Sequence, residues 1–122
     1  MKQLSALEMA VARLLAEQVS PDESPALIAQ LRTAEVSSRE YTGVGFYTEF
    51  SVDEELPPAV VTTSPGGWVR AEVGPDAYPL EFMLYVRDGY AAMIEAYSYF
   101  DGYGDLDLLT APFTEPRALN PW

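Results

Sequence analysis

Glu95 is the residue whose setting in the sequence most directly suggests chemistry. It follows the dipeptide Asp88-Gly89, and a two-residue turn there places Glu95 opposite Phe82 on the more apolar face of a hairpin. Burial on that face disfavours the charged form of a carboxyl group. A buried carboxyl group near the hydroxyl of Tyr97 can act as a general acid or base, or bind a polar group of a ligand. The sequence therefore predicts a candidate pocket at Glu95 and Tyr97.

A structural role is the alternative for Glu95, and it is the commoner one for such a residue. The carboxylate would then pair with an arginine such as Arg39 or Arg70, or would lie at the margin of the sheet. Its face depends on the register of the hairpin, because a shift of one residue turns every side chain of a strand to the other face.

Acidic residues and tyrosines form a second candidate site. Tyrosine provides contact area and hydrogen bonding at a low entropic cost, so carboxylates with interleaved tyrosines suit the binding of a protein. The alternative is that the acidity serves solubility alone. The predicted partner-binding residues are Glu49, Asp53, Glu54, Glu55, Tyr99, Asp101, Tyr103, Asp105 and Asp107.

Three of these residues, Asp101, Asp105 and Asp107, offer the oxygen ligands that calcium takes. Their spacing does not match an EF-hand loop, since Gly102 and Tyr103 occupy its early positions. We expect a solvated turn here and no metal site.

The composition excludes several classes of function. The 122 residues contain nineteen Asp and Glu against seven Lys and Arg, a formal charge of -12, with no histidine and no cysteine. Without imidazole or thiolate there is no Ser-His or Cys-His nucleophile pair, no zinc site of His or Cys and no ordinary haem ligation. We expect no catalytic residue and no cofactor.

The charge also restricts the partners. A single lysine and scattered arginines cannot neutralise many phosphates, so we expect no binding to nucleic acid. No stretch approaches the ~20 apolar residues of a membrane span, and anionic lipid repels acidic protein, so no membrane association is expected. A basic protein is the electrostatically favoured partner, and the absence of cysteine suits the cytoplasm.

Two helices are predicted near the start of the chain. Apolar residues recur every three or four positions over residues 4–14, with Ser5 and Glu8 at the spacing of a capping box. Further on, Ser24-Pro25 predicts a second helix in which the serine is the N-cap and the proline takes the first helical position.

Strands follow from Val36 onward. Over residues 44–52, Phe46 and Thr48 share one face, opposite Tyr47 and Glu49. Residues 60–63 and 68–73 predict two more strands. The hairpin of residues 80–99 is predicted to pair Arg87 with Tyr90 and Leu84 with Met93, with Leu80, Phe82, Leu84, Val86, Ala91, Met93, Glu95, Tyr97 and Tyr99 on one face and Met83, Tyr85, Tyr90, Ala92 and Ile94 on the other.

These elements predict one α+β domain over residues 1–122. Two N-terminal helices (1–35) pack on an antiparallel sheet of four to six strands (36–100), followed by a loop and an extended proline-rich tail (101–122). Because both hairpin faces are apolar, we expect helices on one face and the tail or a second subunit over part of the other. Phe113, Leu119 and Trp122 are the predicted anchors of the tail.

Two segments, SSREYTGVGFYTEFSV and FMLYVRDGYAAMIEAYSYFDGYG, resemble small, largely uncharacterised bacterial α+β proteins. The shared features are the strand GVGFYTEF, a D-G hairpin and an acidic-aromatic end, over roughly residues 24–107. This resemblance implies a fold and no active site. In size and charge the chain is also similar to immunity proteins of bacterial toxin systems, which implies a protein that neutralises a toxin by covering its active surface.

The leading hypothesis is a non-enzymatic protein that binds a basic partner through an acidic, tyrosine-bearing surface. A small-ligand or enzymatic pocket at Glu95, with Tyr97 and one of Arg39, Arg70 or Arg87, is the first alternative. A homodimer whose tyrosine-rich sheet faces meet, with no further activity, is the second.

Overall fold

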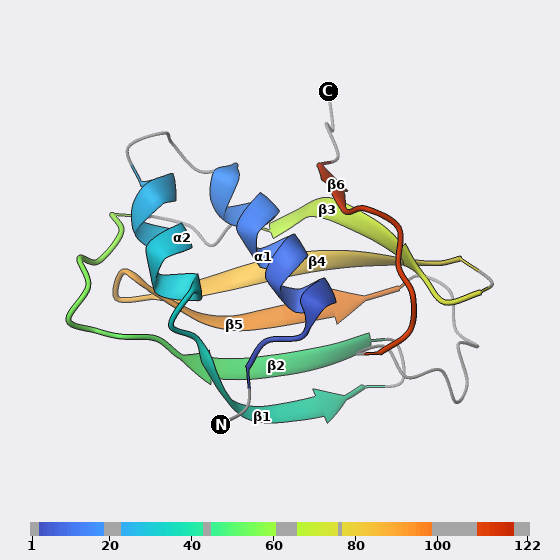
Figure 1. The fold of residues 1–122 in the computed structure, drawn as a ribbon, viewed down its shortest axis with the longest axis horizontal. Coiled ribbons are helices and arrows are strands. Elements are labelled where there is room, and N and C mark those ends of the chain that lie inside the picture. Colours follow the sequence, from blue (N-terminus) through green and yellow to red (C-terminus); the bar gives the residue numbers. More distant parts are fainter. Residues whose placement is uncertain are drawn as a thin grey trace.

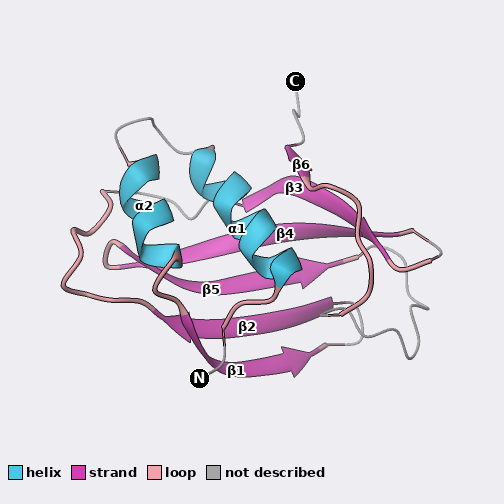
Figure 2. Cartoon of the chain, viewed as in Figure 1, coloured by secondary structure: helices cyan, strands magenta, loops and turns pink. Residues whose placement is uncertain are grey.

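Two helices cover one face of a six-stranded antiparallel sheet in the computed structural model (Figures 1 and 2). The structure describes residues 3–18, 23–42, 45–60, 66–75, 77–98 and 110–118. The strand order is β1-β2-β5-β4-β3-β6, which confirms the predicted α+β fold. The elements are α1 (Ala6–Glu17), α2 (Ser24–Leu31), β1 (Glu35–Tyr41), β2 (Gly45–Ser51), β3 (Gly66–Val73), β4 (Tyr78–Arg87), β5 (Tyr90–Tyr97) and β6 (Arg117–Ala118).

Helix α1 begins with the predicted capping box. The Ser5 hydroxyl accepts a hydrogen bond from the backbone N–H of Glu8 (3.1 Å), and the Glu8 carboxylate accepts one from the N–H of Ser5 (2.7 Å). These bonds satisfy backbone donors that the first turn of a helix otherwise leaves unpaired.

Helix α2 begins one residue earlier than predicted, so the assignment of Ser24 as N-cap is wrong. Glu23 is the N-cap, makes no side-chain capping bond and has helical backbone angles, while Ser24 and Pro25 take the first two helical positions. The Glu23 carboxylate instead accepts a hydrogen bond from the N–H of Val60 (2.6 Å), which ties α2 to the loop after β2.

The core lies between the helices and the sheet. Helix α1 packs over β3 and β4, and α2 packs over β5. Each fully buried Leu, Ile or Phe side chain contributes roughly 2 kcal/mol through the apolar surface that it removes from water. The largest apolar side chains that are buried in this way are Leu7, Leu15, Leu27, Leu31, Phe46, Leu80, Phe82, Leu84 and Ile94.

The β4–β5 hairpin has the predicted turn. Asp88 (φ 52°) and Gly89 (φ 87°) both have positive φ, as a type I′ turn requires, and Arg87 pairs with Tyr90. Beyond the turn a β-bulge changes the register. Val86 pairs with Ala91, but the next pair is Tyr85 with Met93, so Ala92 is an extra residue on β5.

The bulge makes the predicted hairpin pairs wrong by one residue. Leu84 lies opposite Ile94 and not Met93, and Phe82 lies opposite Ala96 and not Glu95. Since side chains alternate with a period of two, this single insertion reverses the predicted faces of β5 after Ala92, while Ala91 stays on the buried face as predicted. Met93, Glu95 and Tyr97 therefore lie on the sheet face away from the helices, and Ile94 lies in the core.

The described part of the tail, residues 110–118, lies along the β3 edge. Ala118 in β6 pairs with Val69, and Phe113 forms a bridge to Val73 and packs against the core, as predicted for that anchor. Leu119 and Trp122 lie outside the described residues. Of the strand predicted at residues 60–63, Val60 lies in a loop, and the rest is outside the described residues.

The helices of the described segments are both short. Neither is long and apolar enough to cross a membrane.

Candidate functional site

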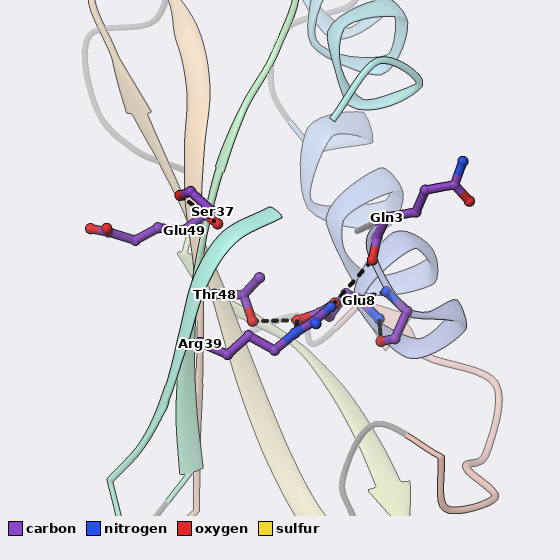
Figure 3. A network of polar contacts seen from close by, with 7 residues as sticks. Gln3, Glu8, Ser37, Arg39, Thr48 and Glu49 are labelled. Carbon is purple, nitrogen blue, oxygen red and sulfur yellow. Dashed lines mark hydrogen bonds and ion pairs between the residues drawn. The ribbon is translucent and has the colours of Figure 1, made fainter. Parts of the chain in front are cut away.

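The sheet face turned away from the helices, which we call the open face, combines tyrosines, methionines and glutamates. Alternation along β2 buries Phe46 and Thr48 on the helix side and turns the residues between them outward. Figure 3 shows Glu49 pointing away from α1, opposite Thr48. On β1, β2, β4 and β5 the open face carries Glu40, Tyr47, Glu49, Glu81, Met83, Tyr85, Met93, Glu95 and Tyr97, and on β3 it carries Glu72 and Arg70, which lies opposite Glu81.

Glu95 lies near the middle of the open face and is half-buried. In the register of the sheet it is flanked by Tyr47 on β2 and Met83 on β4. The Tyr85 hydroxyl donates a hydrogen bond of 2.8 Å to Oε1 of Glu95, and Tyr47 also forms a side-chain hydrogen bond with this carboxylate. Two phenol groups therefore orient one carboxylate.

The hydrogen bonds with Glu95 raise the pKa of both tyrosines, with its negative charge and partial desolvation acting in the same direction. A phenol beside a carboxylate loses its proton less readily, because ionisation would place two negative charges together. Tyr47 and Tyr85 thus stay protonated and act as hydrogen-bond donors.

The predicted ion pair of Glu95 with Arg39 or Arg70 is wrong. Arg39 pairs with Glu8 (2.6 Å), and Arg70 pairs with Glu72 (3.0 Å). The arginines of the chain all lie in the described segments, and none of them forms an ion pair with Glu95. The carboxylate is hydrogen-bonded, but no arginine neutralises its charge.

Two hollows in the described part of the molecule lie away from Glu95 and Tyr97. One, of about 220 Å³, lies at the hairpin end of the sheet and is lined by residues that include Glu54, Arg87 and Tyr90. The other, of about 270 Å³, lies between the start of α1 and the end of α2. Neither encloses the candidate pocket residues, which form part of a surface.

The predicted acidic residues of the β2–β3 connection form an ordered, exposed loop. The Tyr90 hydroxyl lies 2.9 Å from the carbonyl oxygens of both Glu54 and Leu56, and the Asp53 carboxylate accepts a 2.9 Å bond from the N–H of Glu55. The side chains of residues 53–55 are exposed to solvent. This loop holds its carboxylates at the hairpin end of the sheet.

The structure separates the predicted partner-binding residues into groups. Glu49 lies on the open face, where Arg87 approaches it to 3.9 Å, whereas Asp53 follows the end of β2. Strand β5 ends at Tyr97, beside Gly45 at the start of β2 and thus at the opposite end of the sheet from Asp53. The remaining predicted residues, Tyr99, Asp101, Tyr103, Asp105 and Asp107, lie outside the described residues.

A buried polar network lies between α1 and the sheet (Figure 3). The sequence patterns did not predict it. Glu8 is fully buried; Arg39 contacts both of its carboxylate oxygens (2.6 and 3.2 Å), and the Thr48 hydroxyl bonds to Oε2. Burial alone would raise the pKa of Glu8, but hydrogen bonds with Arg39, Thr48 and the Ser5 backbone outweigh it and lower the pKa. The sign of this network in the sequence is Thr48, a polar residue that shares its strand face with the apolar Phe46 and Phe50.

Gln30 of α2 forms a second buried polar contact that the sequence did not reveal. Its amide nitrogen donates to the carbonyl oxygens of Pro57 (3.1 Å) and Gly89 (3.0 Å), and its oxygen accepts from the N–H of Ala91 (2.9 Å). These bonds hold the hairpin turn beside the bulge residue Ala92. Among the described residues, no buried side-chain polar atom lacks a hydrogen-bond partner.

Comparisons of the chain with protein-family models, with curated proteins and with solved structures give no match. Within the described segments, no group of three or more acidic side chains is arranged to hold a metal ion.

Proposed function

We propose that this protein binds a basic partner protein through the open face and catalyses no reaction. One observation carries the proposal. The helices cover one side of the sheet, while the other side presents tyrosines and methionines together with carboxylates, among them Glu81 and Glu95, that pair with no arginine. Aromatic residues and methionine are enriched in protein interfaces, and unpaired carboxylates favour a cationic partner.

The distribution of charge supports the same partner. Arg70 on β3 and Arg117 on β6 both form ion pairs with Glu72, and neither forms one with a carboxylate of the central strands. With a formal net charge of -12, the whole molecule attracts a basic protein. This attraction speeds association at low salt and is screened beyond ~8 Å at physiological ionic strength.

The open face is better suited to binding than to catalysis. Tyr47 and Tyr85 have raised pKa values, which makes them weaker acids than ordinary tyrosines and leaves less of the tyrosinate form that could act as a base. Catalytic groups usually act in a pocket that excludes water, whereas these residues lie on a sheet surface. A partner protein that lies across the sheet can contact Tyr47, Tyr85 and the neighbouring carboxylates at the same time.

The similarity in size and charge to immunity proteins suggests the biological setting of this proposal. In that setting the basic partner is a toxin whose active surface the open face covers. A second copy of this chain is the competing occupant, because two tyrosine-rich faces can also pack together.

Capture from the native cell extract, at low and at high salt, tests the proposal with two variants of equal charge. The face variant carries Glu40→Gln, Glu81→Gln and Glu95→Gln, and the loop variant carries Asp53→Asn, Glu54→Gln and Glu55→Gln. We expect the wild type and the loop variant to retain the same basic protein at low salt, and the face variant to lose it.

Loss of the partner with the loop variant alone would instead assign binding to residues 53–55. Recovery of the chain by itself, together with a dimer mass in light scattering that the face variant abolishes, would replace the proposal by self-assembly. Equal capture by all three proteins would remove both acidic surfaces from the hypothesis.

A further inference from the structure

The carboxylate of Glu95 is oriented but not neutralised. Its two phenol partners occupy part of the roughly four lone-pair positions that a carboxylate offers, so further donors can bind. Arg39, Arg70, Arg87 and Arg117 form ion pairs with other carboxylates, namely those of Glu8, Glu72 and Glu49. A cation from another molecule is therefore the group that can pair with the Glu95 carboxylate.

The bulge at Ala92 provides an independent reason to regard the exposure of Glu95 as functional. A regular ladder would turn Glu95 toward the buried side chains under the helices, where an unpaired charge is costly. Bulges often re-aim a side chain at a functional site. Here the bulge directs Glu95 outward. The buried side chain of Gln30 accepts a hydrogen bond from the N–H of Ala91, the residue before the bulge.

The surroundings of Glu95 favour a guanidinium group over an ammonium group. Tyr47 and Met83 flank it on the neighbouring strands, and Tyr85 contacts it directly. A guanidinium group is planar and weakly hydrated, stacks on aromatic rings and can donate two parallel hydrogen bonds to a carboxylate. An ammonium group is compact and strongly hydrated, so it gains less from these rings and from the thioether.

We infer that the open face recognises an arginine side chain of its partner, whose guanidinium group pairs with Glu95 and stacks against Tyr47 and Tyr85. This inference rests on the proposed function, because it names the group on the basic partner that the face binds. It also makes Glu95 the specificity-determining residue of the surface.

Capped tetra-arginine and tetra-lysine peptides, which carry equal charge, provide the test. Binding is followed through the ring signals of ¹³C-labelled tyrosine in the full-length protein, with Tyr47→Phe and Tyr85→Phe used for assignment. We expect tetra-arginine to bind about fivefold more tightly than tetra-lysine and to shift the signals of Tyr47 and Tyr85 most. Glu95→Gln should weaken tetra-arginine binding about tenfold.

Two further variants separate a specific contact from a general charge effect. Glu17→Gln removes one charge from the exposed end of α1, on the helix side, and should leave both affinities unchanged within about twofold. Tyr47→Leu removes the ring but keeps an apolar side chain, and should bring the two affinities together. Thermal unfolding of each variant verifies that it is folded.

Equal affinity for the two peptides in the wild type, with shifts on the open face, would overturn the arginine inference and leave the proposed function standing. An unchanged affinity of Glu95→Gln, or shifts confined to residues outside the open face, would overturn it as well. Failure of the proposed function appears in the capture experiment instead, either as retention of the partner by the face variant or as recovery of the chain by itself, and does not depend on the peptide result.

Discussion

The side-chain oxygen of Gln30 accepts a hydrogen bond of 2.9 Å from the backbone N–H of Ala91, immediately before the bulge residue Ala92. The amide nitrogen of the same side chain bonds to the carbonyl oxygen of Gly89 at 3.0 Å. Helix α2 thus contacts Gly89 and Ala91, two residues that precede the position where β5 leaves its regular register. Through this contact the helix layer stabilises the arrangement of the opposite, open face.

Gln30→Met should destabilise the protein by about 3 kcal/mol, because it leaves the buried N–H of Ala91 without its partner and removes the bonds to the carbonyl oxygens of Pro57 and Gly89. Urea unfolding measures the change, and amide hydrogen exchange should be faster at Ala91 and its neighbours. The same substitution at the exposed Gln18 is the control, with an expected change within about 0.5 kcal/mol. Equal effects at the two positions would show that the Gln30 bonds do not stabilise the hairpin.

Glu8 should contribute to acid unfolding. Its pKa in the folded state is below the ordinary value of 4.5, so its charged form stabilises the fold above that pH, and this contribution is lost as the pH falls through the folded-state pKa. Glu8→Gln should therefore lower the unfolding free energy at pH 7 by about 3 kcal/mol, since Arg39 loses its partner, and should flatten its decline below pH 4.5.

Urea unfolding over a series of pH values compares Glu8→Gln with the wild type. The difference between the two curves isolates Glu8 from the other carboxylates of the chain. Glu17→Gln is the matched control, because Glu17 is exposed and pairs with Arg13 at 3.6 Å on the surface of α1. If the wild type and Glu8→Gln lost stability in parallel between pH 7 and pH 3, the network would make no pH-dependent contribution.

The tyrosine titration should report the contact with Glu95. Because hydrogen bonds with that carboxylate raise the pKa of Tyr47 and Tyr85, Glu95→Gln should lower both pKa values. The ring signals in alkaline NMR titrations measure this change residue by residue. Glu17→Gln, on the helix side of the molecule, is the control and should leave the pKa values of Tyr47 and Tyr85 unchanged. Unaltered midpoints for Tyr47 and Tyr85 would contradict the contact.

Arg117→Met should loosen the tail while leaving the domain nearly as stable. Arg117 is half-exposed and bonds to Glu72 at 2.8 and 3.1 Å, and an exposed ion pair contributes less than about 1 kcal/mol. Hydrogen exchange at Thr114, whose N–H bonds to the Glu72 carbonyl oxygen, should quicken in the variant. A large drop in the urea midpoint would instead show that the β3 edge stabilises the whole fold.

The local sequence determines the start of α1 and the turn of the β4–β5 hairpin, and the structure confirms both predictions. Ser5 and Glu8 are three residues apart and satisfy each other's backbone groups within one turn of α1. Asp88-Gly89 adopts the positive φ values that a type I′ turn needs. The alternation in β2 likewise predicted that Phe46 and Thr48 share one face, and the structure buries both. These features depend on neighbours in the chain, so the sequence contains their cause.

Long-range packing determined the polar networks. Glu8 meets Arg39 and Thr48, which are 31 and 40 residues away, and Gln30 meets Ala91, 61 residues away. Nothing in local periodicity identifies such partners. Each polar side chain finds them only when the helix layer is placed over the sheet and every buried donor and acceptor must be satisfied.

The face of Glu95 was decided by tertiary structure alone. An alternating strand fits a sheet in two ways that differ by one residue, and the turn sequence favoured the regular ladder. In the folded protein the bulge at Ala92 places Ile94 and Ala96 under the helices and turns Glu95 outward. The physical reason is that this register buries apolar side chains and keeps the carboxylate near water, a balance that exists only once both layers are assembled.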